Sequence, residues 1–511
     1  MVNGSFIDSK SADGFRKCVA KDFAHLYVLN LRGNQRTSGE VSRKEGGKIF
    51  DNGSRATIAI VFFVKDKSVS GNTIDYYDIG DYLKREAKLN LLANFENLDS
   101  VPFEKITPNN KGDWINQRND GFEKLIPLKR DKKLQNPSVF DINSMGVTTG
   151  RDPWVYNFSQ KILTQSVQKC IDTYNADLKR FNARFREAFK QRAKGVKPGD
   201  LYRQLNDKEI TTDKTKIAWT DGLKNKLIKN KNLQESRKES VRLALYRPFN
   251  KQWLYWDKDL IHRQSQFSKI FPNKDAQNVV INTTIRNFSA LVSDTIPDYH
   301  FIKAYPLYYY NDLGRRDYAI SGYALNLFRR HYKDNAITEE EIFYYIYAIL
   351  HHKGYLEKYK NSLAKEAPRT ALSPDFKELS VLGKQLAELH LNYESGEMHE
   401  SVEYNLLENA EMEGYYDVDK MTKKGDRILY NKNIAITKIP KKAFKYVVNG
   451  KSAIDWVIER YQKTMDKDSL IENNPNDYAG GKYVFELLCR VIKLSEKSVD
   501  LIEKISMKRF E

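Results

Sequence analysis

The order of apolar and polar residues predicts alternating helices and strands in the first part of the chain. Residues 10–23 have the spacing of a helix whose apolar side consists of Phe15, Cys18, Val19 and Phe23. Apolar runs rich in β-branched and aromatic residues predict strands at residues 25–31 and 56–64. The second run is almost continuous, which is typical of a strand buried on both faces of an α/β sheet.

Residues 32–55 lie between these two strands, are rich in glycine and show no periodicity. This pattern predicts a long, mobile loop, and long loops within compact domains are usually functional. After the second strand, residues 74–95 predict one more strand and an amphipathic helix.

A second unit is expected to begin near residue 136, where short strands and turn signals set in. It should contain a helix from about Ser159 to Lys194 and consecutive strands within residues 276–302. Another helix should begin at a capping box formed by Thr338 and Glu341. From Pro368 onward, helices should alternate with turns, and the last segment is helical.

The helix predicted near residues 159–194 carries Phe181, Phe185 and Phe189 on one side. Arg180 and Arg184 lie beside this aromatic side. Their guanidinium groups either contact phosphates or form a solvated face, and the sequence leaves both interpretations open.

The net charge of +18 favours a polyanionic partner, because neutralising phosphates releases condensed counterions. The basic excess is concentrated in the middle: residues 161–200 carry ten Lys and Arg against four acids, and residues 213–243 carry nine against four. A merely basic surface is the alternative. The three cysteines are scattered, which indicates a reducing, cytoplasmic compartment, and no apolar run is long enough for a membrane span.

The sequence contains none of the common self-contained catalytic motifs. It lacks a G-x-x-x-x-G-K-[ST] phosphate loop, an H-E-x-x-H metal motif, a G-x-S-x-G nucleophile turn and a G-x-G-x-x-G dinucleotide loop. His351 and His352 are adjacent on a predicted helix, so their side chains should point apart and not share a metal. We therefore expect neither a catalytic residue nor a metal site.

Residues 246–257, YRPFNKQWLYWD, combine cations with aromatic rings. Arg247 and Lys251 supply charge, and Trp253 is one of several rings that could stack on bases. The alternative is an aromatic core in which Arg247 forms a structural ion pair.

Residues 148–154, TTGRDPW, form a second notable motif. Gly150 permits an unusual backbone angle, and Arg151 can pair with the neighbouring Asp152. The motif is either a loop that clamps a DNA backbone or a structural corner. A basic loop with Arg263 and Gln264 follows the aromatic stretch and could contact DNA.

Seven stretches together resemble the carboxy-terminal part of type ISP restriction–modification enzymes, which are related to adenine-specific DNA methyltransferases. They are GSFIDSKSADGFRK, LNLRGNQRTSGEVSRKEGGKIF, GSRATIAIVFFVK, GVTTGRDPWVYNF, LYRPFNKQWLYWD, ITEEEIFYYIYAILHHKGYLEKY and YVVNGKSAIDWVIERY with the following NNPNDY. They occur in the order of the family and cover nearly the whole chain.

The resemblance implies two units. Residues 1–135 would be the C-terminal part of a methyltransferase domain, and residues 136–511 a type ISP-like specificity domain that recognises the DNA target. The fold class would be α/β, with a partial Rossmann-like methyltransferase sheet, followed by a larger α+β target-recognition domain with a helical C-terminal region.

The implied function is sequence-specific binding of double-stranded DNA. The Asn-Pro-Pro-Tyr motif of the family and its glycine-rich S-adenosylmethionine loop are absent from these residues. We therefore expect no cofactor in this chain and no methyl transfer without an upstream methyltransferase half, which could be a separate chain. The alternative is an interaction or structural subunit that completes such a catalytic chain, or a gene fragment without function.

The resemblance and the charge pattern together give a set of expected DNA-binding residues. In the glycine-rich segment these are Arg32, Asn34, Arg36 and Arg55. In the specificity domain they are Gly150, Arg151, Arg180, Arg184, Arg247, Lys251, Trp253, Arg263 and Gln264.

Overall fold

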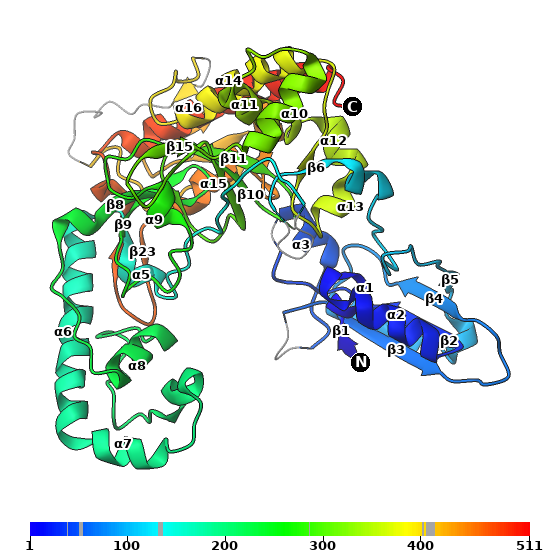
Figure 1. Cartoon of the computed structure of the whole chain (residues 1–511), viewed down its shortest axis with the longest axis horizontal. Coiled ribbons are helices and arrows are strands. Elements are labelled where there is room, and N and C mark those ends of the chain that lie inside the picture. Colours follow the sequence, from blue (N-terminus) through cyan, green and yellow to red (C-terminus); the bar gives the residue numbers. More distant parts are fainter. Residues whose placement is uncertain (38, 51–54, 131–135, 286, 401–402, 405–413) are drawn as a thin grey trace.

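A five-stranded mixed sheet forms the core of the N-terminal part of the chain (Figure 1). The computed structural model describes residues 1–37, 39–50, 55–130, 136–285, 287–400, 403–404 and 414–511. The strands, in their order across the sheet, are β1 (Val2–Asn3), β3 (Ile58–Val64), β2 (His25–Asn30), β4 (Thr73–Asp78) and β5 (Glu104–Lys105). β2 and β4 are parallel, whereas β3 runs antiparallel to both of its neighbours.

Helices and loops cover both faces of this sheet. The helices are α1 (Ser5–Asp8), α2 (Asp13–Asp22), α3 (Gly39–Glu45) and α4 (Arg85–Ala93). Ile7 and Val19 of α1 and α2 pack on Leu26 and Val28 from one face. Leu29 points to the other face, where residues of α4 pack.

The strands expected at residues 25–31 and 56–64 are confirmed as β2 and β3, but burial of the second on both faces is wrong. Only Ala59 of β3 is buried, and Phe62 and Val64 are 43% and 40% exposed. The reason is the edge position of this strand, since β1 pairs only with Ile58 and Ala59.

The helix expected at residues 10–23 is confirmed as α2, but its buried side differs from the expected one. Phe15 is 56% exposed and Cys18 is also exposed, whereas Arg16 and Val19 are buried. Arg16 tolerates burial because its guanidinium donates to the backbone carbonyls of Phe6, Ser9 and Gly112. The prediction that residues 32–55 lack regular structure is also wrong, because they contain α3.

The middle of the chain consists of short sheets flanked by helices. Its strands are β6 (Ile126–Pro127), β7 (Tyr156–Asn157), β8 (Val241–Arg247), β9 (Asn250–Tyr255), β10 (Val280–Thr283), β11 (Ala290–Ser293), β12 (Ile296–Pro297), β13 (Lys303–Pro306), β14 (Tyr308–Tyr310), β15 (Arg316–Tyr318) and β16 (Arg369–Thr370). Its helices are α5 (Asp152–Val155), α6 (Gln160–Arg184), α7 (Arg186–Arg192), α8 (Asp221–Ile228) and α9 (Phe267–Ile270). Two of the sheets have the orders β12-β8-β9-β7 and β11-β10-β13.

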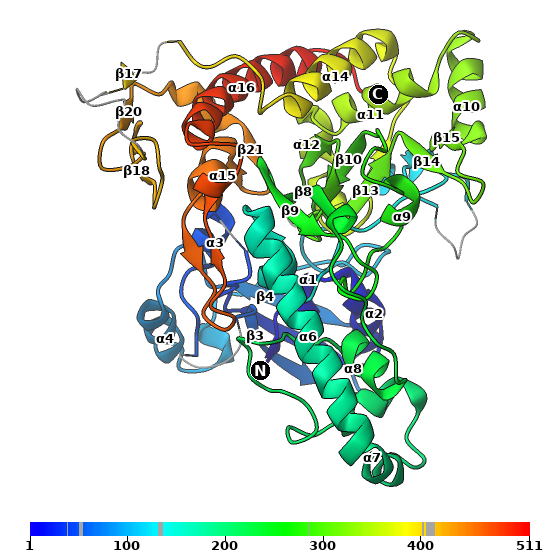
Figure 2. The same cartoon turned by 90° about the vertical axis from the view of Figure 1, so that its left-hand side faces the viewer.

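The helix expected from Ser159 to Lys194 is confirmed as α6 and α7, which are separated at Phe185. Phe181 and Phe189 are buried and their rings lie 5.5 Å apart, so the aromatic side belongs to a core. In Figure 2, α6 crosses the front of the molecule as a long diagonal helix.

The C-terminal region combines helices with small sheets. The helices are α10 (Gly322–Tyr332), α11 (Glu339–Ile349), α12 (Lys353–Lys358), α13 (Lys360–Leu363), α14 (Phe376–Leu391), α15 (Ala453–Arg460) and α16 (Tyr483–Ser506). The strands are β17 (Glu403–Tyr404), β18 (Thr422–Lys424), β19 (Arg427–Leu429), β20 (Ala435–Thr437), β21 (Val447–Val448), β22 (Lys451–Ser452), β23 (Thr464–Met465) and β24 (Glu472–Asn473). The expectation of only helices and turns after Pro368 is therefore wrong.

The expected capping box at the start of α11 is confirmed. The Glu341 amide donates to Thr338 Oγ1 over 3.2 Å, and the Thr338 amide donates to Glu341 Oε2 over 2.9 Å. α11, α14 and α16 pack together at the top of Figure 2. Within the part of the chain that the structure describes, every helix is too short or too polar to cross a membrane.

A buried ionic cluster joins the N-terminal sheet region to the helices α12 and α13. Arg118 Nε donates to Asp113 Oδ2 over 2.8 Å, and its Nη1 donates to Glu366 Oε1, which follows α13, over 2.9 Å. Lys365 lies 2.7 Å from Asp8 and 3.4 Å from Asp113. Burial alone would raise the pKa of Asp113, but the hydrogen bonds from Arg118 and the Lys365 charge hold it well below its usual range.

We expect Arg118→Met to lower the free energy of unfolding by about 3–5 kcal/mol, because the substitution leaves a buried carboxylate without its main partner. Denaturant unfolding followed by circular dichroism measures the change. The control is Arg43→Met, which removes a solvent-exposed ion pair with Glu40 and should cost less than about 1 kcal/mol. Equal losses in the two variants would contradict the role of the cluster.

Candidate nucleic-acid interface

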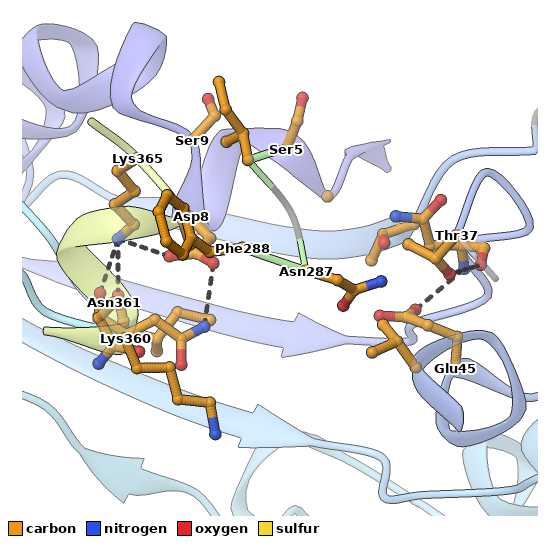
Figure 3. Close-up of a pocket in the computed structure, with 18 of the residues that line it drawn as sticks. Ser5, Asp8, Ser9, Thr37, Glu45, Asn287, Phe288, Lys360, Asn361 and Lys365 are labelled. Carbon is orange, nitrogen blue, oxygen red and sulfur yellow. Dashed lines mark hydrogen bonds and ion pairs between the residues drawn. The ribbon is translucent and has the colours of Figure 1, made fainter. Parts of the chain in front are cut away.

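A polar cleft of 1330 Å³ lies where the sheet of the N-terminal part meets the C-terminal helices. One wall comes from residues 3–5 and 7–11 and from the carboxyl ends of β2 and β4. The opposite wall comes from residues 285–289, without residue 286, and from α12 and α13. Figure 3 shows Asn287 and Phe288 between the Asp8–Lys365 pair and the segment with Thr37 and Glu45. Ligands commonly bind at the carboxyl edge of such sheets.

The polar side chains at the two strand ends bond to one another. Asn30 Nδ2 donates to Tyr76 Oη over 3.0 Å, and Tyr76 Oη donates to Asp78 Oδ2 over 3.1 Å. Arg32 Nε donates to Asp78 Oδ1 over 2.5 Å, and the same guanidinium pairs with Asp81. The expected DNA-binding residue Arg32 thus lies in the cleft, with its charge held by two carboxylates.

Lys88 fixes the segment that follows β2. Its buried Nζ donates to the backbone carbonyls of Leu31, Glu45 and Gly47 over 2.9, 2.8 and 3.0 Å. Burial lowers the pKa of Lys88 to about 8. These bonds tie both ends of residues 31–47 to α4.

The tied segment presents two expected residues to the cleft. Asn34 and Arg36 line the cleft wall, and the Asn34 amide donates to Glu45 Oε2 over 2.9 Å. Arg55 does not line the cleft but lies next to this segment, because its Nη2 donates to the Gln35 carbonyl over 3.0 Å. The structure therefore brings the four expected residues of the N-terminal part to one side of the molecule.

The two motifs singled out in the sequence meet in a second groove of 570 Å³, which we call the motif groove. It is lined by residues 147–153, Arg247 and residues 298–300. Arg247 Nη1 donates to Asp298 Oδ2 over 2.5 Å, and its guanidinium lies 3.9 Å from the centre of the Tyr246 ring. Burial raises the pKa of Asp298 to about 7, although the Arg247 charge opposes this shift.

Arg151 supports residues 147–153, the loop that lines the motif groove. This buried side chain donates through Nη2 to Thr220 Oγ1 over 2.8 Å and through Nη1 to Cys170 Sγ over 3.7 Å. Gly150 has φ +68°, and a Cβ there would lie 3.1 Å from the Thr220 methyl group and 3.6 Å from His262. Arg151 thus supports the loop, and Gly150 allows its close approach to the neighbouring segments.

Arg263 and Gln264 follow His262 directly and lie beside the motif groove. The amide of Arg263 donates to the Thr148 carbonyl over 2.8 Å, and the Thr148 amide donates back over 3.1 Å. The Arg263 side chain is exposed. This places the basic loop next to Gly150, as a DNA interface built from both motifs would require.

Other expected residues lie elsewhere. Lys251 is buried between Glu394 and Asp294, at 2.8 and 3.2 Å, and Trp253 packs near Tyr478. Arg180 pairs with Asp177 over 2.6 Å on α6, where Arg184 is exposed. These four residues do not line the cleft or the motif groove.

A basic pocket of 560 Å³ adjoins the motif groove and was missed in the set of expected residues. Its cationic lining consists of Lys226, Lys229, Lys231, Arg237 and Lys258. Lys226 pairs with Asp259. Thr220 and His262, the side chains that a Cβ on Gly150 would meet, also line this pocket. The charge count of residues 213–243 was the signal that could have identified it.

The arrangement suits a polyanion better than a metal ion. Among the described residues, no group of three His, Cys, Asp or Glu side chains could hold a metal. His351 Nδ1 lies 2.8 Å from the Tyr347 carbonyl, and His352 Nε2 lies 2.8 Å from the Lys508 carbonyl. Both histidines are therefore engaged with the backbone.

Residues 138–487 match the family model of the Type ISP C-terminal specificity domain. The chain is 36% identical to a nuclease-deletion mutant of the Type ISP restriction-modification enzyme LlaGI, solved with a DNA substrate mimic, with a TM-score of 0.86. It is 33% identical to the ATP-dependent Type ISP enzyme LlaBIII bound to DNA, with a TM-score of 0.85. A DrdV–DNA complex is 28% identical, with a TM-score of 0.81.

These similarities extend over nearly all of this chain but over less than two thirds of each relative. The matches cover 100%, 100% and 98% of this chain, and 39%, 33% and 50% of LlaGI, LlaBIII and DrdV, respectively. No curated protein matches the chain.

We expect Lys88→Met to lower the free energy of unfolding by about 1–3 kcal/mol, since buried carbonyls lose their donor. Hydrogen exchange should also become faster at the amides of Gly33 and Gly47, which close this segment. The control is Lys84→Met, which changes an exposed lysine at the N-cap of α4. Unchanged exchange in Lys88→Met would show that the segment does not depend on this side chain.

Proposed function

Because this chain belongs to the family of Type ISP C-terminal specificity domains, we propose that it recognises a DNA sequence as part of an adenine-specific methyltransferase and restriction–modification enzyme. The observation that carries the proposal is the motif groove, in which two motifs about 100 residues apart in the sequence share one surface next to a basic pocket. Relatives solved with DNA support DNA as the partner, and we propose that this DNA is double-stranded.

In this proposal the motif groove and the basic pocket contact different parts of the DNA. Exposed side chains of the motif groove, such as Tyr299, contact base edges or stack on bases. The lysines of the basic pocket hold phosphates, which gives affinity without sequence preference. Arg247 and Arg151 shape the groove, and Arg263 and Gln264 flank it.

Residues 1–135 finish a Rossmann-like methyltransferase sheet in this proposal, and residues 136–511 form the specificity domain. The parallel pair β2 and β4 supports a Rossmann-like sheet, as does the coverage of both its faces. The groups at the strand ends of the cleft are occupied with one another, so they do not fit an S-adenosylmethionine cradle. We therefore propose that this chain does not transfer a methyl group alone.

The open edge of β3 favours a second candidate function, that of a subunit that completes a separate methyltransferase chain. β1 pairs with Ile58 and Ala59 only, and within the described residues no strand pairs with the rest of that edge. Exposed Phe62 and Val64 belong to the same unpaired part. Unpaired strand edges with apolar side chains are sites where another strand can add. The two candidates are compatible if the partner is the upstream half.

The first test is selection of bound duplexes from a random DNA pool at about physiological salt. We expect one short site to be enriched, and we expect Tyr299→Ala to reduce the discrimination between this site and a scrambled duplex about tenfold, since one base contact contributes ~1–3 kcal/mol. The control is Tyr323→Ala on α10, whose side chain is exposed to a similar degree, 42% against 45%. No enrichment by the folded protein would leave the subunit as the better candidate.

We expect Lys229→Glu with Lys231→Glu to weaken binding to target and scrambled duplexes equally. The salt dependence should become shallower by about 0.9 per lost phosphate contact, because fewer counterions are released. Fluorescence titrations at several salt concentrations measure both effects. The matched control is Lys424→Glu with Lys432→Glu, which changes two exposed lysines near β18 and β19 by the same charge. A similar loss in the control would assign the effect to net charge alone.

A further inference from the structure

The turn Asn449–Gly450 is part of a stretch that the family resemblance singled out and that the proposed function leaves without a role. It connects β21 to β22, which pair as an antiparallel hairpin. Both residues have positive φ, +48° and +81°, as a two-residue hairpin turn requires. Asn-Gly is the sequence that favours such a turn, so local chemistry explains its shape.

The turn lies between the cleft and the motif groove. Val447 and Gly450 line the cleft, and His300, which contacts the turn, lines the motif groove. A Cβ on Gly39, at the start of α3, would overlap the carbonyl oxygen of Gly450. The segment held by Lys88 is therefore in backbone contact with this turn.

Asn449 contacts both sites at once. Its backbone amide donates to Ser289 Oγ over 2.9 Å, and Ser289 belongs to the cleft wall. Its side-chain Nδ2 lies 2.8 Å from Nε2 of His300. One residue thus joins the wall of the cleft to the wall of the motif groove.

His300 is suited to accept this hydrogen bond. Burial lowers the pKa of His300 to about 3, and the nearby charges of Arg247, Arg460 and Lys451 act in the same direction. The ring is therefore neutral, and Nε2 can accept from the Asn449 amide group. The backbone amide of His300 donates to Asp298 Oδ1 over 2.8 Å, and Asp298 in turn pairs with Arg247. Asn449 is therefore connected through His300 to the Arg247–Asp298 ion pair of the motif groove.

We propose that Asn449 is a positioning residue that holds residues 298–300 of the motif groove in register with the cleft, so that bases read in the groove lie at a fixed distance from the strand ends of the N-terminal sheet. This inference rests on the proposed function. It assigns to Asn449 a part in sequence discrimination that does not involve contact with DNA.

Asn449→Gly isolates the side-chain contact. Glycine adopts positive φ readily and keeps the backbone amide that donates to Ser289, so the turn should form. Only the bond to His300 is lost. We expect about a tenfold loss of discrimination between the enriched and the scrambled duplex, with an unchanged salt dependence, because the lysines of the basic pocket are not altered.

Asn449→Asp is the rescue variant. Aspartate also tolerates positive φ, and its carboxylate can accept from His300 when the imidazole carries its proton on Nε2. We therefore expect discrimination close to that of the unaltered chain. The matched control is Asn230→Gly, since Asn230 also has positive φ, +56°, but lies outside the cleft and the motif groove. Equal discrimination by Asn449→Gly and the unaltered chain would overturn the inference, as would equal loss in Asn449→Asp.

Hydrogen exchange gives a second measurement that needs no DNA. The amides of Tyr299 and His300 donate to the Val147 carbonyl and to Asp298. We expect both amides to exchange faster in Asn449→Gly and not in Asn230→Gly, and unchanged exchange would overturn the positioning role. If the unaltered chain enriches no DNA sequence, the proposed function fails and the inferred part in discrimination fails with it. The exchange result then decides only whether Asn449 holds the loop.

Discussion

A buried carboxylate must keep its cationic partners, and Asp113 imposes this constraint on the N-terminal part of the chain. Arg118 satisfies Asp113 and at the same time reaches Glu366, which lies about 250 residues later in the chain. Charge pairing therefore joins the N-terminal sheet region to the residues that directly follow α13. Since these elements are the walls of the cleft, the shape of the cleft depends on the same cluster.

The elements with strong local signals could be predicted from the sequence, and the side chains that deviate from hydrophobic patterning could not. β2 and α11 have clear periodicity, and the capping box of α11 needs only residues three positions apart. Arg16 is buried in place of Phe15 because its guanidinium donates to the carbonyls of Phe6 in α1 and of Gly112, 96 residues later in the chain. No local pattern contains that information. The small sheet with β18, β19 and β20 was missed because its strands have only three residues each.

In the candidate site, too, some features could be predicted from the sequence and others could not. Composition drew attention to Gly150, Arg247 and Arg263, and they lie near one another because Thr148 bridges to Arg263 and Val147 bridges to Asp298, the ion-pair partner of Arg247. The same criterion also selected Lys251, whose charge is used inside the protein. His300 carried no sequence signal, because a lone histidine acquires a role only through partners such as Asn449, 149 residues away. Residue type thus indicated which side chains are able to bind DNA. Only the tertiary structure showed which of them are exposed and which support the fold.

The open edge of β3 has a consequence for the behaviour of the protein in concentrated solution. A strand with unpaired backbone groups and exposed Phe62 and Val64 could template its own copies and start aggregation. Exposed Lys65 and Lys67 follow the strand on either side of Asp66, and two copies that pair in parallel along this edge would bring their lysines together. An acidic or neutral strand would meet no such repulsion. Lys65 and Lys67 at the end of β3 thus disfavour edge-to-edge self-association of this strand.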